Sequence, residues 1–269
     1  MIDVHTHLHP PRLFAAIRRW FAERSTWQLT HPTEPEDVVR VLREHGVEQF
    51  AFCSYAHKPG IARDLNTWLA ATARSLGRGA VPLATVHIDD RDPLGDVRDA
   101  LRDGCAGLKV HEDVQRFQLE DPKLDGVLDA IARHDGFVLV HVGHIPWSEQ
   151  TDDGPARVER VLERHPALRV VVAHFGVPDS RRYLDLAARH PRLFLDTTMA
   201  FARESPMAAA VDRYDIARGV SQIVLGTDYP NIPYDYDGDL RGLRDRGVPE
   251  AMIRRITSEN ARRLGPAFR

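Results

Sequence analysis

Six side chains that can bind a metal ion or move a proton lie at or near the C-terminal ends of apolar, strand-like segments, although they are spread over most of the chain. Imidazole, amine and carboxylate groups in such a set suit a divalent cation of the zinc type. Only a barrel of parallel strands would bring these residues to one point, because the strand ends then share one face. The six residues are His5, His7, Lys109, His141, His174 and Asp228.

The first apolar segment, residues 2–7, carries two of these histidines two positions apart. Side chains at positions i and i+2 of a strand point to the same face, so His5 and His7 can share one cation. We expect His141 and Asp228 to complete the site around one divalent ion, with Zn²⁺ as the expected metal. Such an ion lowers the pKa of a bound water from about 15.7 toward 7, and Asp228 is placed to accept the proton. Hydrolysis is therefore the leading chemistry.

The fold is predicted from eight strand-like segments that alternate with amphipathic helical segments such as residues 37–43. The alternation indicates parallel strands with helical crossovers, and the count of eight favours a closed (β/α)₈ TIM barrel over an open sheet. A capping box is expected at Thr33 and Glu36, and Asp92 followed by Pro93 is typical of a helix start. The strand-like segments are residues 2–7, 48–55, 80–88, 106–111, 137–141, 169–174, 193–198 and 223–228.

Length and composition fit one globular unit over residues 1–269, with 43% hydrophobic and 28% charged residues. A net charge of −3 gives no support for a nucleic-acid partner, and arginine alternates with acidic residues. No apolar run reaches membrane-spanning length and no secretory signal pattern opens the chain, so we expect a cytoplasmic protein without a membrane partner. Cys53 and Cys105 are expected to be buried thiols. A homodimer is the base-rate expectation for the oligomeric state.

One connection, residues 9–31, is long and rich in aromatic side chains. It follows the first strand and therefore lies on the face where barrel enzymes place their active sites. Two interpretations stay open: a lid over the site, or a packing insertion that caps the barrel.

The candidate residues and their local motifs resemble the amidohydrolase superfamily, and more narrowly the "amidohydrolase 2" branch of metal-dependent TIM-barrel hydrolases and decarboxylases. The resemblance covers nearly the whole chain. It implies a hydrolase that acts on a small amide, lactone or ester, with or without a carboxylate group. The alternative is a non-oxidative decarboxylase of a small aromatic or enoic acid, and a third hypothesis is a metal-binding barrel without turnover. The motifs are His5-Thr6-His7, Gly107-Leu108-Lys109-Val110-His111, His141, His174-Phe175-Gly176 and Gly226-Thr227-Asp228-Tyr229-Pro230.

The resemblance also bears on how many metal ions the site holds. Two-metal members of the superfamily imply a carboxylated Lys109 that bridges two ions, with His174 as a ligand of the second. Single-metal members of the similar branch imply an unmodified lysine and a catalytic His174 that polarises the substrate or transfers a proton. One ion is favoured.

The remaining polar residues have weaker signals. Candidates for contact with a small-molecule substrate are His9, His111, Arg116, His144 and Trp147. Each histidine could equally orient a metal ligand, and Arg116 could grip a substrate carboxylate or pair at the surface. Four further histidines fall near predicted helix C-termini, where partial positive charge suits the helix dipole, and are expected to be structural. These are His45, His134, His165 and His190.

Overall fold

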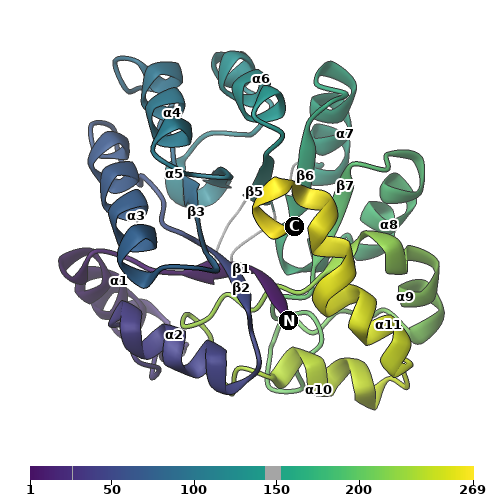
Figure 1. Cartoon of the computed structure of the whole chain (residues 1–269). Helices are drawn as coiled ribbons and strands as arrows, with labels where there is room; N and C mark the ends of the chain where they lie inside the picture. Colours follow the sequence, from purple (N-terminus) through teal and green to yellow (C-terminus); the bar gives the residue numbers. More distant parts are fainter. Residues whose placement is uncertain (26, 143–152) are drawn as a thin grey trace.

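Eight parallel strands in the order β1 to β8 form the centre of the protein, as the computed structural model of residues 1–25, 27–142 and 153–269 describes it (Figure 1). Each strand lies where the sequence predicted one, which confirms the (β/α)₈ TIM barrel. The strands are β1 (Ile2–His7), β2 (Gln49–Cys53), β3 (Ala80–Ala84), β4 (Gly107–His111), β5 (Phe137–His141), β6 (Arg169–Val172), β7 (Leu193–Asp196) and β8 (Ile223–Val224).

The helices form an outer ring around the strands (Figure 1). The C-terminal residues 260–268 cover the N-terminal end of the barrel, where the ring of Phe268 lies 6.0 Å from that of Phe137. The opposite end is left for the site. The helices are α1 (Pro11–Arg24), α2 (Pro35–Glu44), α3 (Ala62–Leu76), α4 (Pro93–Arg102), α5 (Glu112–Gln115), α6 (Asp125–Arg133), α7 (Gly154–Arg164), α8 (Ser180–Arg189), α9 (Arg213–Gly219), α10 (Gly238–Asp245) and α11 (Glu250–Arg254).

Strand alternation decides which side chains enter the barrel. On β5, Leu139 packs in the barrel interior whereas Val138 and Val140 pack against the outer helices. Because side chains alternate along a strand, His141 shares the inward face with Leu139. The same alternation of side chains along β4 directs the side chain of Lys109 into the barrel.

An irregularity in β1 changes this alternation. From Asp3 to Thr6 the chain of β1 advances by three residues, whereas the paired part of β2 advances by only two. β1 therefore contains one extra residue. Val4 packs in the barrel interior, and a regular strand would therefore turn His5 outward. The extra residue returns His5 and His7 to the inner face, as a β-bulge does next to many active sites.

The barrel closes through backbone hydrogen bonds between β1 and the residues after β8. Val4 N donates to Leu225 O over 2.8 Å, and Asp228 N donates to His5 O over 2.7 Å. β8 itself is only two residues long, shorter than the predicted 223–228, because the chain after Val224 leaves regular strand geometry. The closing bonds nevertheless fix Asp228 beside β1.

Local predictions are confirmed in part. The Asp92 side chain caps α4 by accepting from Gly95 N, whereas α2 begins at Pro35 after Glu34, so the capping box at Thr33 is wrong. Within residues 9–31 the chain forms α1, which the sequence pattern did not predict. The four histidines expected near helix ends are the C-terminal caps of α2, α6, α7 and α8.

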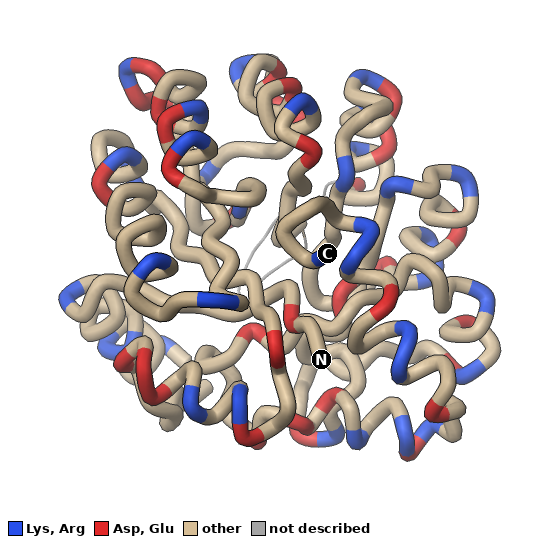
Figure 2. The backbone as a smooth tube through the Cα atoms, viewed as in Figure 1, with Lys and Arg blue, Asp and Glu red and all other residues tan. Residues whose placement is uncertain are grey.

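Basic and acidic positions are interspersed along the outer helices (Figure 2). In the described part of the chain, no helix combines the length and apolar character needed to cross a membrane. Cys53 and Cys105 are buried free thiols, as expected.

Candidate metal centre and active-site pocket

A pocket of about 100 Å³ lies at the C-terminal ends of the strands, and all six residues singled out from the sequence line it. They come from β1, β4, β5 and the segments that follow β6 and β8, so the barrel gathers residues up to 223 positions apart in the sequence. The lining consists of His5, His7, Phe21, Trp27, Tyr55, Lys109, His111, His141, His174, Met199, Pro206, Met207, Asp228 and Asn231.

Three donor atoms converge at the centre of the pocket. His5 Nε2 lies 3.2 Å from His7 Nε2 and 3.6 Å from Asp228 Oδ1. Two ligand atoms bound to one tetrahedral Zn²⁺ at 2.0–2.1 Å are about 3.3 Å apart. These two separations therefore fit a shared divalent ion, and the donor types are those that zinc prefers.

The site also carries the charge pattern that a cation requires. Burial alone would raise the pKa of Asp228, but His7 and His5 outweigh it and hold that pKa well below its ordinary value. Burial alone would lower the pKa of His7, but Cys53 and Asp228 raise it to about 9. His7 Nε2 and Asp228 Oδ1 are 2.7 Å apart. Asp228 is thus an ionised carboxylate that faces positive charge, which a proton on His7 or a metal ion can supply.

His5 is kept neutral and oriented. Burial, and then the neighbouring Lys109, lower the pKa of His5 well below its ordinary value. Lys109 Nζ lies 3.1 Å from His5 Nε2, so the lysine amine borders the same space as the converging donor atoms. This position is compatible with either state of Lys109 considered from the sequence.

Asp196 at the end of β7 is a site residue that the sequence reasoning missed. Its Oδ2 accepts from His5 Nδ1 over 2.8 Å, and its Oδ1 accepts from His174 N over 2.9 Å. Burial raises the pKa of Asp196 to about 6, with hydrogen bonding by Thr198 and the charge of Lys109 opposing the rise. A carboxylate that receives Nδ1–H leaves Nε2 free for a metal ion. The signal was available, because Asp196 also ends an apolar segment.

His141, His174 and His111 form a second group of imidazoles in the pocket. The ring centroids of His141 and His174 are 4.5 Å apart, and His111 stacks on His141 at 4.0 Å. Burial lowers the pKa of His174 and of His111 well below the ordinary value, with His141 adding to the effect. Both are therefore neutral imidazoles. His174 Nδ1 is buried and has no hydrogen-bond partner among the residues described.

Backbone strain concentrates at the same place. His174 and Phe175 have φ values of 55° and 53°, and Asp228 has a φ of 59°. The left-handed region is unfavourable for side chains of this size, and such strain persists where the surroundings over-determine it. Phe175 is fully buried against Phe201, which holds the turn in place.

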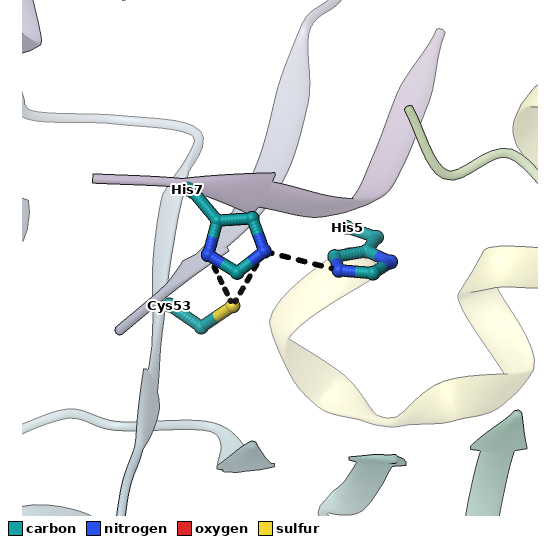
Figure 3. Close-up of side chains that lie close together, drawn as sticks. All are labelled: His5, His7 and Cys53. Carbon is teal, nitrogen blue, oxygen red and sulfur yellow. Dashed lines mark hydrogen bonds between the residues drawn. The ribbon is translucent and has the colours of Figure 1, made fainter. Parts of the chain in front are cut away.

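Cys53 is a second residue whose role the sequence reasoning missed. Its Sγ lies 3.6 Å from His7 Nδ1 and 4.0 Å from His7 Nε2 (Figure 3). His5, His7 and Cys53 together make a buried cluster of metal-binding side-chain types. The sequence predicted the burial of Cys53 but not this contact.

The structure places the remaining predicted residues at different distances from the pocket. His9 is buried behind the pocket, where it stacks on His7 at 5.4 Å and its Nδ1 lies 2.8 Å from Ser54 Oγ. His111 lines the pocket, but Arg116 is exposed at the C-terminal end of α5 and lines a separate surface depression. The structure therefore does not bring Arg116 to the site, because the chain turns outward after α5. His144 and Trp147 lie outside the described residues.

Comparison with known proteins adds the family. The sequence model of the amidohydrolase family Amidohydro_2 matches residues 2–264. Among curated proteins, none matches the chain.

Solved structures with similar folds include both hydrolases and decarboxylases. A 2,6-dihydroxybenzoate decarboxylase from Rhizobium has a TM-score of 0.72 at 17% identity, with 98% of this chain and 97% of that chain covered. The 5-carboxyvanillate decarboxylase from Sphingomonas paucimobilis has a TM-score of 0.69 at 16% identity, with 98% of both chains covered. A probable 2-pyrone-4,6-dicarboxylic acid hydrolase from Acinetobacter baumannii has a TM-score of 0.65 at 14% identity, again with 98% of both chains covered. At these identities the likeness establishes the fold.

The contact between Asp196 and His5 generates a prediction. Asp196→Asn keeps the size of the side chain but weakens the acceptor for His5 Nδ1–H, so we expect metal affinity to fall about 10- to 100-fold. Competition with a chromophoric chelator measures the affinity. Asp239→Asn is the matched control, because Asp239 is equally buried but bonds to the backbone of Met199, Phe201 and Ala202. Equal metal affinity in the Asp196→Asn and wild-type proteins would contradict the assignment.

Proposed function

Since the chain belongs to the amidohydrolase family, we propose that it is a metal-dependent hydrolase that cleaves a small amide, lactone or ester. The observation that carries the proposal is the convergence of two imidazole nitrogens on an ionised carboxylate, His5 Nε2 and His7 Nε2 beside Asp228 Oδ1. This arrangement combines a cation site with a base, which are the two requirements for hydrolysis by an activated water.

Four residues would bind the metal ion, and one of them would also accept the proton. His5, His7, His141 and Asp228 would hold one divalent ion, with Zn²⁺ as the expected metal. When bound, such an ion lowers the pKa of water and polarises the substrate carbonyl. Asp228 accepts the proton of the attacking water, because its carboxylate is held in the ionised form next to His7.

His174 supplies the second catalytic function. Its neutral imidazole lines the pocket, and its backbone N–H is fixed by Asp196. A neutral imidazole can donate a hydrogen bond to a developing oxyanion, and it can accept a proton at one nitrogen before it passes one to the leaving group. We assign His174 to that role in a site with one ion; with two ions and a carboxylated Lys109, it would be a ligand instead.

A second candidate function is non-oxidative decarboxylation of a small aromatic or enoic acid. The walls of the pocket favour it, because Trp27, Tyr55, Met199 and Met207 offer flat or adaptable apolar surface to an unsaturated ring. The donor set serves either reaction. Assays with lactones, amides and aromatic carboxylates, with CO₂ release recorded separately, distinguish the two functions. Turnover of no compound by metal-loaded protein would instead support a metal-binding barrel without activity.

We also propose that residues 9–31 form a lid over the pocket. Phe21 and Trp27 of this segment line the pocket. Helix α1, which forms most of the segment, buries only the side chain of Phe14 and is therefore weakly packed on the barrel. Two hydrogen bonds fasten the segment to the loop after β8: Trp27 Nε1 donates to Asn231 O over 2.7 Å, and His31 Nε2 lies 2.8 Å from Tyr234 O. A helix with a single buried side chain is the kind of element that opens locally.

The metal site predicts the metal content of variants. The double substitution His5→Ala and His7→Ala should abolish stoichiometric metal, measured by elemental analysis, whereas the control His134→Ala with His190→Ala should leave it unchanged. His174→Asn reports the number of ions: loss of one of two equivalents means a binuclear site, and unchanged metal with lost activity means one ion. Wild-type metal content in the first double variant would refute the assigned ligands.

The proton-accepting role of Asp228 predicts the behaviour of Asp228→Asn. The amide retains the size and one oxygen but cannot act as a base, and loss of a general base costs about 10²- to 10⁴-fold in rate. We expect kcat for hydrolysis to fall by that amount while the metal stays bound, and the acidic limb of the pH profile to flatten. Near-normal hydrolysis by the metal-loaded variant would remove Asp228 as the base and place decarboxylation first.

The lid predicts a difference between two tryptophans of the same segment. Trp27→Phe keeps a ring in the pocket but removes the bond to Asn231 O, which is worth about 1 kcal/mol, so the open fraction should rise about fivefold. Limited proteolysis within residues 9–31 measures that fraction. Trp20→Phe is the control, because Trp20 is exposed and does not line the pocket. Equal cleavage rates for the two variants would argue for a packing insertion.

A further inference from the structure

Asn231, in the loop after β8, lines the pocket and is 7% exposed. Its backbone makes two hydrogen bonds: Asn231 N donates to Asp228 O over 2.7 Å, and Trp27 Nε1 donates to Asn231 O over 2.7 Å. Its side-chain Oδ1 is buried and has no hydrogen-bond partner among the residues that the structure describes. Asn231 therefore joins Asp228 to the proposed lid through its backbone, and its side-chain amide is left unused.

A structural role does not account for this side chain. Buried amides are nearly always hydrogen-bonded, because an unpaired amide loses the bonds that it makes with water. Asparagine is common in turns since its side chain can bond to nearby backbone, but here the backbone makes both bonds. Asn66 shows the ordinary case: it is 3% exposed, and its amide donates to Thr85 O over 3.0 Å and accepts from Thr85 N over 2.7 Å. The pocket is the remaining place from which a partner can reach the Asn231 amide.

We propose that Asn231 is a substrate-binding residue that hydrogen-bonds an uncharged hydroxyl or N–H group next to the reacting carbonyl. An amide offers both a donor and an acceptor, so it matches such a group. The bond to Asp228 O keeps Asn231 close to the candidate metal centre, which places the recognised group beside the carbonyl rather than at the far end of the substrate. The inference rests on the proposed function and narrows its substrate class.

The charges around the pocket favour an uncharged group over a second carboxylate. Lys109 is the one Lys or Arg among the described lining residues, and its Nζ lies 3.1 Å from His5 Nε2, at the candidate metal centre. Residues 143–152, which lie outside the described part of the chain, contain neither Lys nor Arg. The ionised carboxylate of Asp228 repels a second anion on the Asn231 side. A neutral amide is suited to a neutral partner at this position.

Three matched probes test the inference on Zn²⁺-loaded protein, with dissociation constants measured by titration calorimetry. Benzamide offers a ring and a carbonyl, 2-hydroxybenzamide adds a hydroxyl next to that carbonyl, and 2-carboxybenzamide adds a carboxylate there. We expect the wild type to bind the hydroxyl probe about tenfold more tightly than benzamide, and the carboxylate probe more weakly than benzamide. Asn231→Leu has a side chain of similar size without a hydrogen-bonding group, so it should bind benzamide and 2-hydroxybenzamide equally.

Thermal stability supplies a second readout that separates substrate binding from a structural role. Asn231→Leu removes an unpaired amide and leaves both backbone bonds in place, so we expect the Tm of the protein without probe not to fall. Asn66→Leu is the matched control: it removes two hydrogen bonds from an equally buried amide and should lower the Tm. An equal fall in Tm for the two variants would overturn the inference.

The binding data can overturn it independently. Equal binding of benzamide and 2-hydroxybenzamide by the wild type, a preference for the carboxylate probe, or binding of none of the three would each do so. A hydroxyl preference that persists in Asn231→Leu would belong to the metal ion and would also overturn it. Zinc content is measured on the same samples, and a wild type without bound Zn²⁺ would refute the proposed function together with this inference.

Discussion

The closure of the barrel is the constraint on which the site depends. Asp228 N donates to His5 O, and His7 N donates to Tyr229 O, so the last strand is joined to the first at the level of the candidate ligands. The same bonds that complete the barrel place a carboxylate from one end of the chain beside imidazoles from the other. The electrostatic pairing of His7 with Asp228 then offsets part of the cost of burying charge there. Fold and site are therefore stabilised by one set of contacts.

Much of the architecture could be predicted from the sequence because parallel strands buried on both faces are continuous apolar runs, and those runs are visible in this chain. Polar residues at the ends of such runs, as at Lys109 and His141, stand out for the same reason. Asp196 and Cys53 carry the identical signal and were not recognised, because an acid or a thiol at a strand end has many other uses. What identified them was a distance to a histidine nitrogen, which sequence does not contain.

Other features were not predicted from the sequence because they depend on tertiary contacts. The extra residue in β1 returns His5 to the inner face although Val4 already points inward, and no local pattern distinguishes that from a regular strand. The argument that His5 and His7 share a face was correct, but the face itself was set by the bulge. Helix α1 has a single buried residue and begins at Pro11, the second of two consecutive prolines, so its apolar pattern was too weak to separate from a loop. Arg116 was misplaced because the turn that points it outward, with φ of 59°, is unusual for arginine.

The division between scaffold and loops also explains why the same donor set fits either of the two proposed reactions. The donor atoms belong to strands or to residues fixed by the closing hydrogen bonds, and in the proposed function this part of the site would provide a cation position and a base. In the proposed function, specificity comes from lining side chains outside the strands, namely Phe21, Trp27, Met199 and Met207. Met199 is itself held with φ of 58° by Asp239, which accepts from its backbone N–H. The two proposed reactions, hydrolysis and decarboxylation, differ in where the substrate would present its carbonyl or carboxylate to the same donors, so under the proposed function the wall residues would decide which bond is broken.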